Sequence, residues 1–148
     1  MDAIKFLIRE HRKVKKMLAE IAKKSRRDAT KRKMFATLSS DLSHHEKMEQ
    51  TIWYPYLKKT TPLITPIKHL ITEEKSAAKA ITKIKKIKPQ EEWQEKFVQF
   101  RKDVLHHASE EETKLFPKVK KSLDEQDLKD IGKKMQLFKK KLDASTKK

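Results

Sequence analysis

The chain has 148 residues, which is within the usual size of one domain and enough to bury an apolar core. One glycine, five prolines and 40% charged residues favour helices over a sheet protein with many tight turns. The absence of cysteine excludes disulfides, thiolate zinc sites and cysteine-ligated iron–sulfur clusters. Any metal must therefore be held by nitrogen and oxygen atoms.

No apolar run approaches the roughly 18 residues that a membrane-spanning helix requires, and residues 1–12 carry charges where a signal peptide is apolar. We therefore expect a cytoplasmic protein without membrane insertion. The formal net charge of +17 could attract nucleic acid or an acidic partner protein. Because no aromatic-basic recognition motif accompanies this charge, a solvated lysine surface is the favoured interpretation.

The first two predicted helices each place a histidine on an apolar stripe. Residues 2–24 repeat apolar side chains with the 3.6-residue period of a helix, and His11 lies in the middle of that stripe. A polar connection leads to a second stripe, which we expect to end near Pro55 or shortly after it. On this second stripe, His45 and Glu49 take inward positions.

The third and fourth predicted helices follow the same pattern. A loop containing three threonines and two prolines ends at Pro66, a first-turn proline, and the third helix then runs to Pro89. The fourth stripe is interrupted by Pro117. The polar residues that we expect to face inward on these two helices are His69, Glu73, His107 and Glu111.

A short fifth helix, with apolar residues at heptad-like spacing, is expected within residues 123–143 and packed on the bundle, followed by a disordered lysine tail at 144–148. The predicted fold is thus all-α, with residues 1–122 forming an up-down-up-down four-helix bundle. In this topology, histidines early in the first and third helices lie level with histidines late in the second and fourth. All four imidazoles can meet at one end of the bundle.

The chain repeats a motif at an offset of 62 residues. DLSHHEKMEQTIWYPYLKK, residues 41–59, aligns with DVLHHASEEETKLFPKVKK, residues 103–121, with eight of 19 positions identical. Each copy contains a histidine followed four residues later by a glutamate, which places both side chains on one face of a helix. Such a pair can chelate one metal, or bind one and bridge to a second. The preceding histidines of the doubled pairs, His44 and His106, then lie outside.

A rival set of ligands has the i,i+3 carboxylate–histidine spacing of ferritin-like di-iron bundles. It comprises Asp41 with His44 and Asp103 with His106, with Glu10 and Glu73 or Glu74 as partners. We favour it less, because it lies beside the apolar stripes and leaves four inward histidines without a function. Simple burial of those histidines and two glutamates is also disfavoured, since each costs several kcal/mol unless it is paired or metal-bound.

These motifs resemble the hemerythrin-like (HHE cation-binding) family: REH in the first helix, HHEKMEQTIWYP, a lone histidine that opens the third helix, and HHASEEETKLFP. The similarity covers about residues 2–121. It implies a centre of two iron ions, oxo- or hydroxo-bridged, with manganese or zinc as less favoured metals. Side chains of the WYP and LFP segments, among them Tyr54, would help to close the pocket. The implied ligands are His11, His45, Glu49, His69, His107 and Glu111.

Departures from the family pattern leave further ligands open. Oxygen carriers have a second histidine where this chain has Glu73, and they use a five-residue spacing that would select Glu112; some iron sensors use the position of Glu46. Carriage of oxygen is thus less expected than binding or sensing of oxygen, nitric oxide, peroxide or iron. The alternatives are a peroxide-degrading or oxidase enzyme and a basic nucleic-acid-binding module.

Overall fold

The computed structural model describes residues 1–146. All regular secondary structure in this part of the chain is helical, which confirms the predicted all-α class. Two segments, η1 and η2, are π-helical. The elements are α1 (Ala3–Ile21), α2 (Asp28–Met48), η1 (Glu49–Trp53), α3 (Tyr54–Thr60), α4 (Ile64–Lys86), α5 (Gln90–Glu110), η2 (Glu111–Leu115), α6 (Phe116–Ser122) and α7 (Glu125–Thr146).

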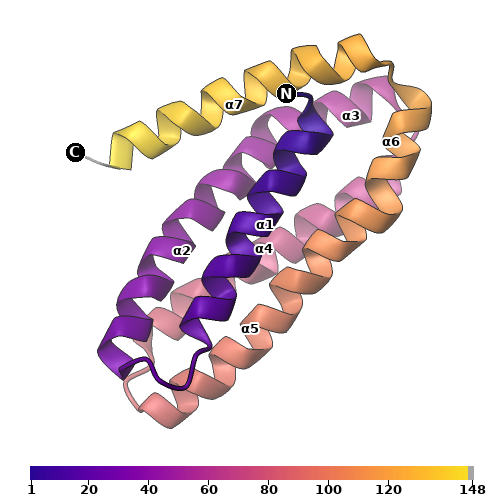
Figure 1. Cartoon of the computed structure of the whole chain (residues 1–148). Helices are drawn as coiled ribbons and strands as arrows, with labels where there is room; N and C mark the ends of the chain where they lie inside the picture. Colours follow the sequence, from indigo (N-terminus) through magenta and orange to yellow (C-terminus); the bar gives the residue numbers. More distant parts are fainter. Residues whose placement is uncertain (147–148) are drawn as a thin grey trace.

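Four long rods lie side by side, and successive rods run in opposite directions (Figure 1). The first is α1 and the third is α4, whereas the second joins α2, η1 and α3, and the fourth joins α5, η2 and α6. The first rod packs against α2 and α5, and α4 packs against the same two helices. Across residues 1–146, no helix combines the length and apolarity needed to cross a membrane.

The second and fourth rods continue through the prolines that we expected to end or interrupt them. Pro55 and Pro117 each follow a π-helical segment, and the helices then run on to Thr60 and Ser122. A proline lacks the backbone N–H of a helical residue, and its ring crowds the preceding turn. The wider π turn relieves this crowding. At its end the backbone N–H of Tyr54 donates to the carbonyl of Glu49, five residues back, and the fourth rod repeats this arrangement.

The apolar core is divided into two clusters along the rods. One cluster surrounds Trp53 and Phe116 at the end where α7 packs, and the other surrounds Phe35, Trp93 and Phe97 at the opposite end. In every rod the residues between the two clusters include buried histidine or glutamate side chains. A polar layer therefore crosses the middle of the protein.

Helix α7, yellow in Figure 1, lies obliquely across α1 and α2 and also packs on η1. The only glycine of the chain, Gly132, is at this contact: a Cβ atom there would lie 2.5 Å from the backbone nitrogen of Ala3. The helix is longer than predicted, because residues 144–146 continue it instead of starting a tail. The hydroxyl of Ser145 donates to the carbonyl of Leu142 in this last turn. The remaining tail residues, 147 and 148, lie outside the described residues.

Candidate metal centre

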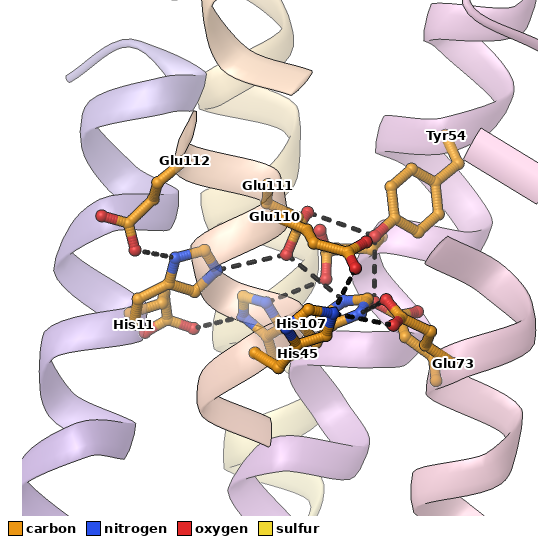
Figure 2. A network of polar contacts seen from close by, with 12 residues as sticks. His11, His45, Tyr54, Glu73, His107, Glu110, Glu111 and Glu112 are labelled. Atoms are coloured by element: carbon orange, nitrogen blue, oxygen red, sulfur yellow. Dashed lines mark hydrogen bonds and ion pairs between the residues drawn. The ribbon is translucent and has the colours of Figure 1, made fainter. Parts of the chain in front are cut away.

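Three histidines from three rods meet in the polar layer, and of these His11 and His45 are buried and His107 is partly buried (Figure 2). His11 comes from α1, His45 from α2 and His107 from α5, and the ring centroids of His11 and His45 are 5.7 Å apart. The antiparallel arrangement brings the early position in α1 level with the late positions in α2 and α5. The topology predicted that four imidazoles meet at one end of the bundle, but three of them meet, and they lie between the two apolar clusters.

The Nε2 atom of each imidazole faces an inner carboxylate. These contacts are 3.3 Å from His11 to Glu111, 2.9 Å from His45 to Glu49, and 3.1 and 3.4 Å from His107 to Glu74 and Glu111. The four carboxylates that face inward are nearly or completely buried, and they are Glu46, Glu49, Glu74 and Glu111. The layer thus presents histidine nitrogens and carboxylate oxygens to one another around a common centre.

The Nδ1 atom of each imidazole faces a second, outer carboxylate. These contacts are 2.8 Å from His11 to Glu112, 3.0 Å from His107 to Glu73, and 3.5 Å from His45 to Glu10. At His11 and His107 the carboxylate is within hydrogen-bond distance of Nδ1, where it can hold the proton on that nitrogen and direct Nε2 to the inside, whereas the contact of His45 is an ion-pair distance without a hydrogen bond. Among histidines that bind metals, this arrangement of an outer carboxylate is common.

Tyr54 connects two of the inner carboxylates. Its hydroxyl is 3.0 Å from Oε2 of Glu74 and 3.1 Å from Oε2 of Glu111. The side-chain amide of Gln50 also donates to Glu74, at 2.9 Å. Tyr54 is completely buried, so it closes this side of the layer, the position expected for the WYP segment.

The crowding of buried acids shifts their proton affinities. Burial, and then the charge of Glu74, raises the pKa of Glu46 to about 9. Burial and the neighbouring Glu111 also raise the pKa of Glu49 well above its usual value. Burial works against ionisation of Glu111, but contacts with Glu49, His107 and His11 outweigh it and hold that pKa well below its usual value. Without a cation, Glu46 and Glu49 therefore favour their protonated forms, whereas Glu111 favours its carboxylate form.

The pKa values of two histidines in the layer are also raised. Burial by itself would lower the pKa of His107, but the hydrogen bonds and charges of Glu111 and Glu74 raise it to about 11. The pKa of His11 is raised too, because Glu111 and Glu112 outweigh its burial. A bound cation would take over the role of these protons, since it neutralises the carboxylates directly.

The donor atoms fit one or more metal ions. Nε2 of His11, both oxygens of Glu49 and Oε1 of Glu111 are buried and make no hydrogen bond within residues 1–146. Two sets of donor atoms lie close enough to hold a cation each: His11, His45 and Glu111 in one, and Glu49, Glu74, His107 and Glu111 in the other. Glu111 belongs to both sets. A carboxylate placed in this way can bridge two ions.

Five of the six predicted ligands come together in this layer, and His69 does not. The side chain of His69 is 61% exposed and lies 3.5 Å from Glu73 and 3.3 Å from Glu110, in a separate group near the surface. In α4, Ile67 and Leu70 face the core, so the buried acid on this face is Glu74 rather than Glu73. The apolar residues of α4 indicate in the sequence which face of the helix is buried.

The rival set of carboxylate–histidine pairs does not share a site. Asp41 pairs with Lys13 and Lys139, and Nδ1 of His44 lies 2.9 Å from the accepting carboxylate oxygen Oδ1 of Asp143 in α7. His106 is largely exposed and contacts Glu110. Both outer histidines of the doubled pairs therefore lie outside the polar layer, as their register predicted.

A cavity of about 200 Å³ leads from the surface between α4 and α5 to the polar layer. At its inner end are Glu46, Glu74 and His107, and exposed residues such as Ser76 and His106 line its outer part. Apolar side chains form much of the wall, namely Leu42, Ala77, Ala80, Phe100 and Val104. Two of the inner carboxylates, Glu46 and Glu74, thus line a cavity that could hold a molecule of a few atoms.

Helical rods crossed by a layer of convergent histidines and glutamates define an all-helical cation-binding domain. The family model described as Hemerythrin HHE cation binding domain matches residues 2–119, and the chain belongs to this family. The resemblance read from the motifs is therefore confirmed. Searches of curated proteins and of solved structures gave no match. The matched residues include the whole polar layer except for its contacts with α7.

Proposed function

We propose that this protein is an up-down-up-down four-helix bundle that binds two non-haem iron ions and binds or senses a small molecule such as oxygen, nitric oxide or peroxide. The proposed ligands are His11, His45, Glu49, Glu74, His107 and Glu111. The observation that carries this proposal is the position of Glu111, whose carboxylate belongs to both groups of donor atoms. Glu74 takes the place in α4 that we had expected for His69.

The donor set supports iron as the metal. Histidine nitrogen and carboxylate oxygen without sulfur suit iron, manganese and zinc. Among these metals we favour iron, because the resemblance to the hemerythrin-like family implies a di-iron centre. When bound, the irons would supply a redox-active Lewis-acid centre. The described chain supplies the cage around it, and the cavity of about 200 Å³ is the route by which a small molecule would reach it.

In this proposal, the residues around the ligands hold them in position. The outer carboxylates Glu73 and Glu112 orient His107 and His11 through Nδ1. Tyr54 holds Glu74 and Glu111 in place through its hydroxyl. Burial, followed by the charges of the surrounding glutamates, raises the pKa of Tyr54 well above its usual value, so the phenol keeps its proton.

The number of bound irons tests the proposal. After anaerobic reconstitution with Fe(II) and removal of free metal, we expect two irons per chain. Glu111→Gln should lose both ions, because one side chain serves both positions. Glu110→Gln is the matched control, since its side chain faces His69 and His106 instead of the polar layer, and it should keep two irons.

Two results would contradict the proposal. A reconstituted chain without iron would exclude the metal centre. One iron per chain, unchanged in Glu111→Gln, would exclude Glu111 as a shared ligand. Addition of nitric oxide to the reduced, loaded protein should change its visible spectrum, whereas the metal-free protein should give no response.

A further inference from the structure

Helix α7 lies outside the residues that the family model matches, yet it reaches the polar layer. It does so through Lys139, whose side chain is only 5% exposed although most lysines of this chain lie at the surface. A buried ammonium group is costly unless opposite charges surround it. The contacts of Lys139 therefore indicate why α7 packs where it does.

The ammonium of Lys139 joins three elements. Its Nζ atom lies 3.0 Å from Oε1 of Glu10 in α1, 3.0 Å from Oδ1 of Asp41 in α2 and 3.5 Å from Oδ2 of Asp143 in α7 itself. The same oxygen of Glu10 lies 3.5 Å from Nδ1 of His45. A continuous chain of contacts thus runs from α7 through Glu10 to His45.

His45 differs in this respect from His11 and His107. The outer carboxylates of His107 and His11 are partly open to solvent, with side chains 22% and 25% exposed, whereas Glu10 is 10% exposed. Of these three outer carboxylates, Glu10 is the one that contacts a buried lysine. Lys15, the lysine nearest to Glu112, is itself half exposed and 3.8 Å away.

We propose that α7 is part of the metal centre, in which Lys139 positions Glu10 and Glu10 positions the imidazole of His45. This inference rests on the proposed function. With Lys139 in place, Glu10 remains beside Nδ1, and Nε2 of His45 points to Glu49 and the interior, at 2.9 Å. Without the ammonium, Asp41 keeps its contact with the exposed Lys13, but Glu10 loses its lysine partner and with it the contact that holds it beside Nδ1 of His45.

Coupling of this kind acts in both directions. A metal ion bound to His45 requires the orientation that Glu10 and Lys139 stabilise, so metal binding also stabilises the packing of α7 on α1 and α2. The C-terminal helix thus reports whether the metal position at His45 is filled. In the metal-loaded chain, we expect slower amide hydrogen exchange over the middle of α7 than in the metal-free chain.

Cobalt(II) titration of the full chain tests the inference, because the visible bands of cobalt depend on its ligands and not on packing elsewhere. Lys139→Met should weaken cobalt binding about tenfold or more and change these bands, as loss of an outer partner does at other sites. Glu10→Gln should have the same effect. Because both residues act on His45 through the same contact, the double variant should bind cobalt about as tightly as the single variant with the lower cobalt affinity.

Two controls separate positioning from packing. Ile131→Ala removes a buried apolar contact of α7 and should lower the unfolding temperature without changing the cobalt spectrum. Lys140→Met makes the same change as Lys139→Met at an exposed neighbouring position and should bind cobalt as the unaltered chain does.

Either of two results would overturn the inference. In the first, Lys139→Met gives the spectrum and affinity of the unaltered chain. In the second, Ile131→Ala changes both as much as Lys139→Met does, so that α7 contributes packing alone. Failure of the unaltered chain to bind cobalt or iron would instead overturn the proposed function, and with it this inference.

Discussion

Neighbouring glutamates in the polar layer have different tasks because an α-helix turns by 100° per residue. Glu111 faces the interior and Glu112 faces Nδ1 of His11; Glu74 faces the interior and Glu73 faces Nδ1 of His107. Each pair thus provides one inner and one outer carboxylate. A shift of one position along the helix thus decides which of the two carboxylates can bind a metal ion.

The substitutions His69→Ala and Glu74→Gln should therefore differ in their effect on iron binding. His69→Ala removes an exposed side chain and should keep two irons per chain after reconstitution. Glu74→Gln removes an inner oxygen ligand and should lose at least one iron or bind it at least tenfold more weakly. Metal analysis of both variants after dialysis checks this prediction. Loss of iron from His69→Ala with full loading of Glu74→Gln would restore His69 as the ligand.

The sequence motifs could predict the histidines of α1, α2 and α5, because each lies on a clear apolar stripe. The motifs could not decide which face of α4 points to the interior. That helix carries adjacent acids at Glu73 and Glu74, and its small alanines fit either of two neighbouring faces. The buried residues Ile67 and Leu70 decide between them, and they would have selected Glu74 if the stripe had been read from the apolar residues alone.

At the scale of elements, the two π-helical segments begin at the inner glutamates Glu49 and Glu111 and end just before the residue that precedes each proline. The spacing from glutamate to proline is six residues in both copies of the motif. Periodicity predicts regular helices and misses such a widening, although the repeated spacing was visible in the sequence. π-helical turns often occur at functional sites, where they shift the register of a helix.

The packing of α7 depends on the missing side chain of Gly132. Gly132→Ala should destabilise the fold by about 1 kcal/mol or more, although alanine is the better helix former, because a Cβ atom at this place collides with the backbone at the start of α1. Chemical denaturation measures this difference. Lys133→Ala, at an exposed neighbouring position, should be nearly neutral. Equal or higher stability of Gly132→Ala would show that α1 and α7 can separate at no cost.

At the scale of the whole molecule, the two apolar clusters are separated by a layer that is stable only when its charges are balanced. In the metal-free protein this balance depends on protons, because the pKa of Glu46 is raised to about 9 and that of His107 to about 11. The position of α7 could not be predicted from sequence, since it depends on ion pairs between residues about 100 to 130 positions apart.

The metal-free protein should become less stable as the pH rises from about 6.5 to about 9. In this pH range the folded state keeps protons on Glu46 and His107. The unfolded chain has lost them, because the ordinary pKa is 4.5 for the glutamate and 6.5 for the histidine. A rising pH therefore favours unfolding. Thermal unfolding of the metal-free chain at several pH values measures this trend.

Two comparisons complete this prediction. Glu46→Gln should reduce the loss of stability with pH, because glutamine cannot ionise, while Glu95→Gln at an exposed position should leave it unchanged. Iron should raise the unfolding temperature and flatten the pH dependence, since ligands that bind only the folded state stabilise it. A pH dependence identical in metal-free and metal-loaded protein would contradict this explanation.

Helix α7 covers α1, α2 and η1, whereas the cavity opens between α4 and α5, next to His107 and Glu74. In the proposed centre the two halves of the duplicated motif are therefore not equivalent. The ion beside His45 would lie on the side that α7 covers, and the ion beside His107 would lie next to the cavity between α4 and α5. In the proposed centre, two half-sites made from one repeated motif would thus differ in their surroundings because of a single added helix.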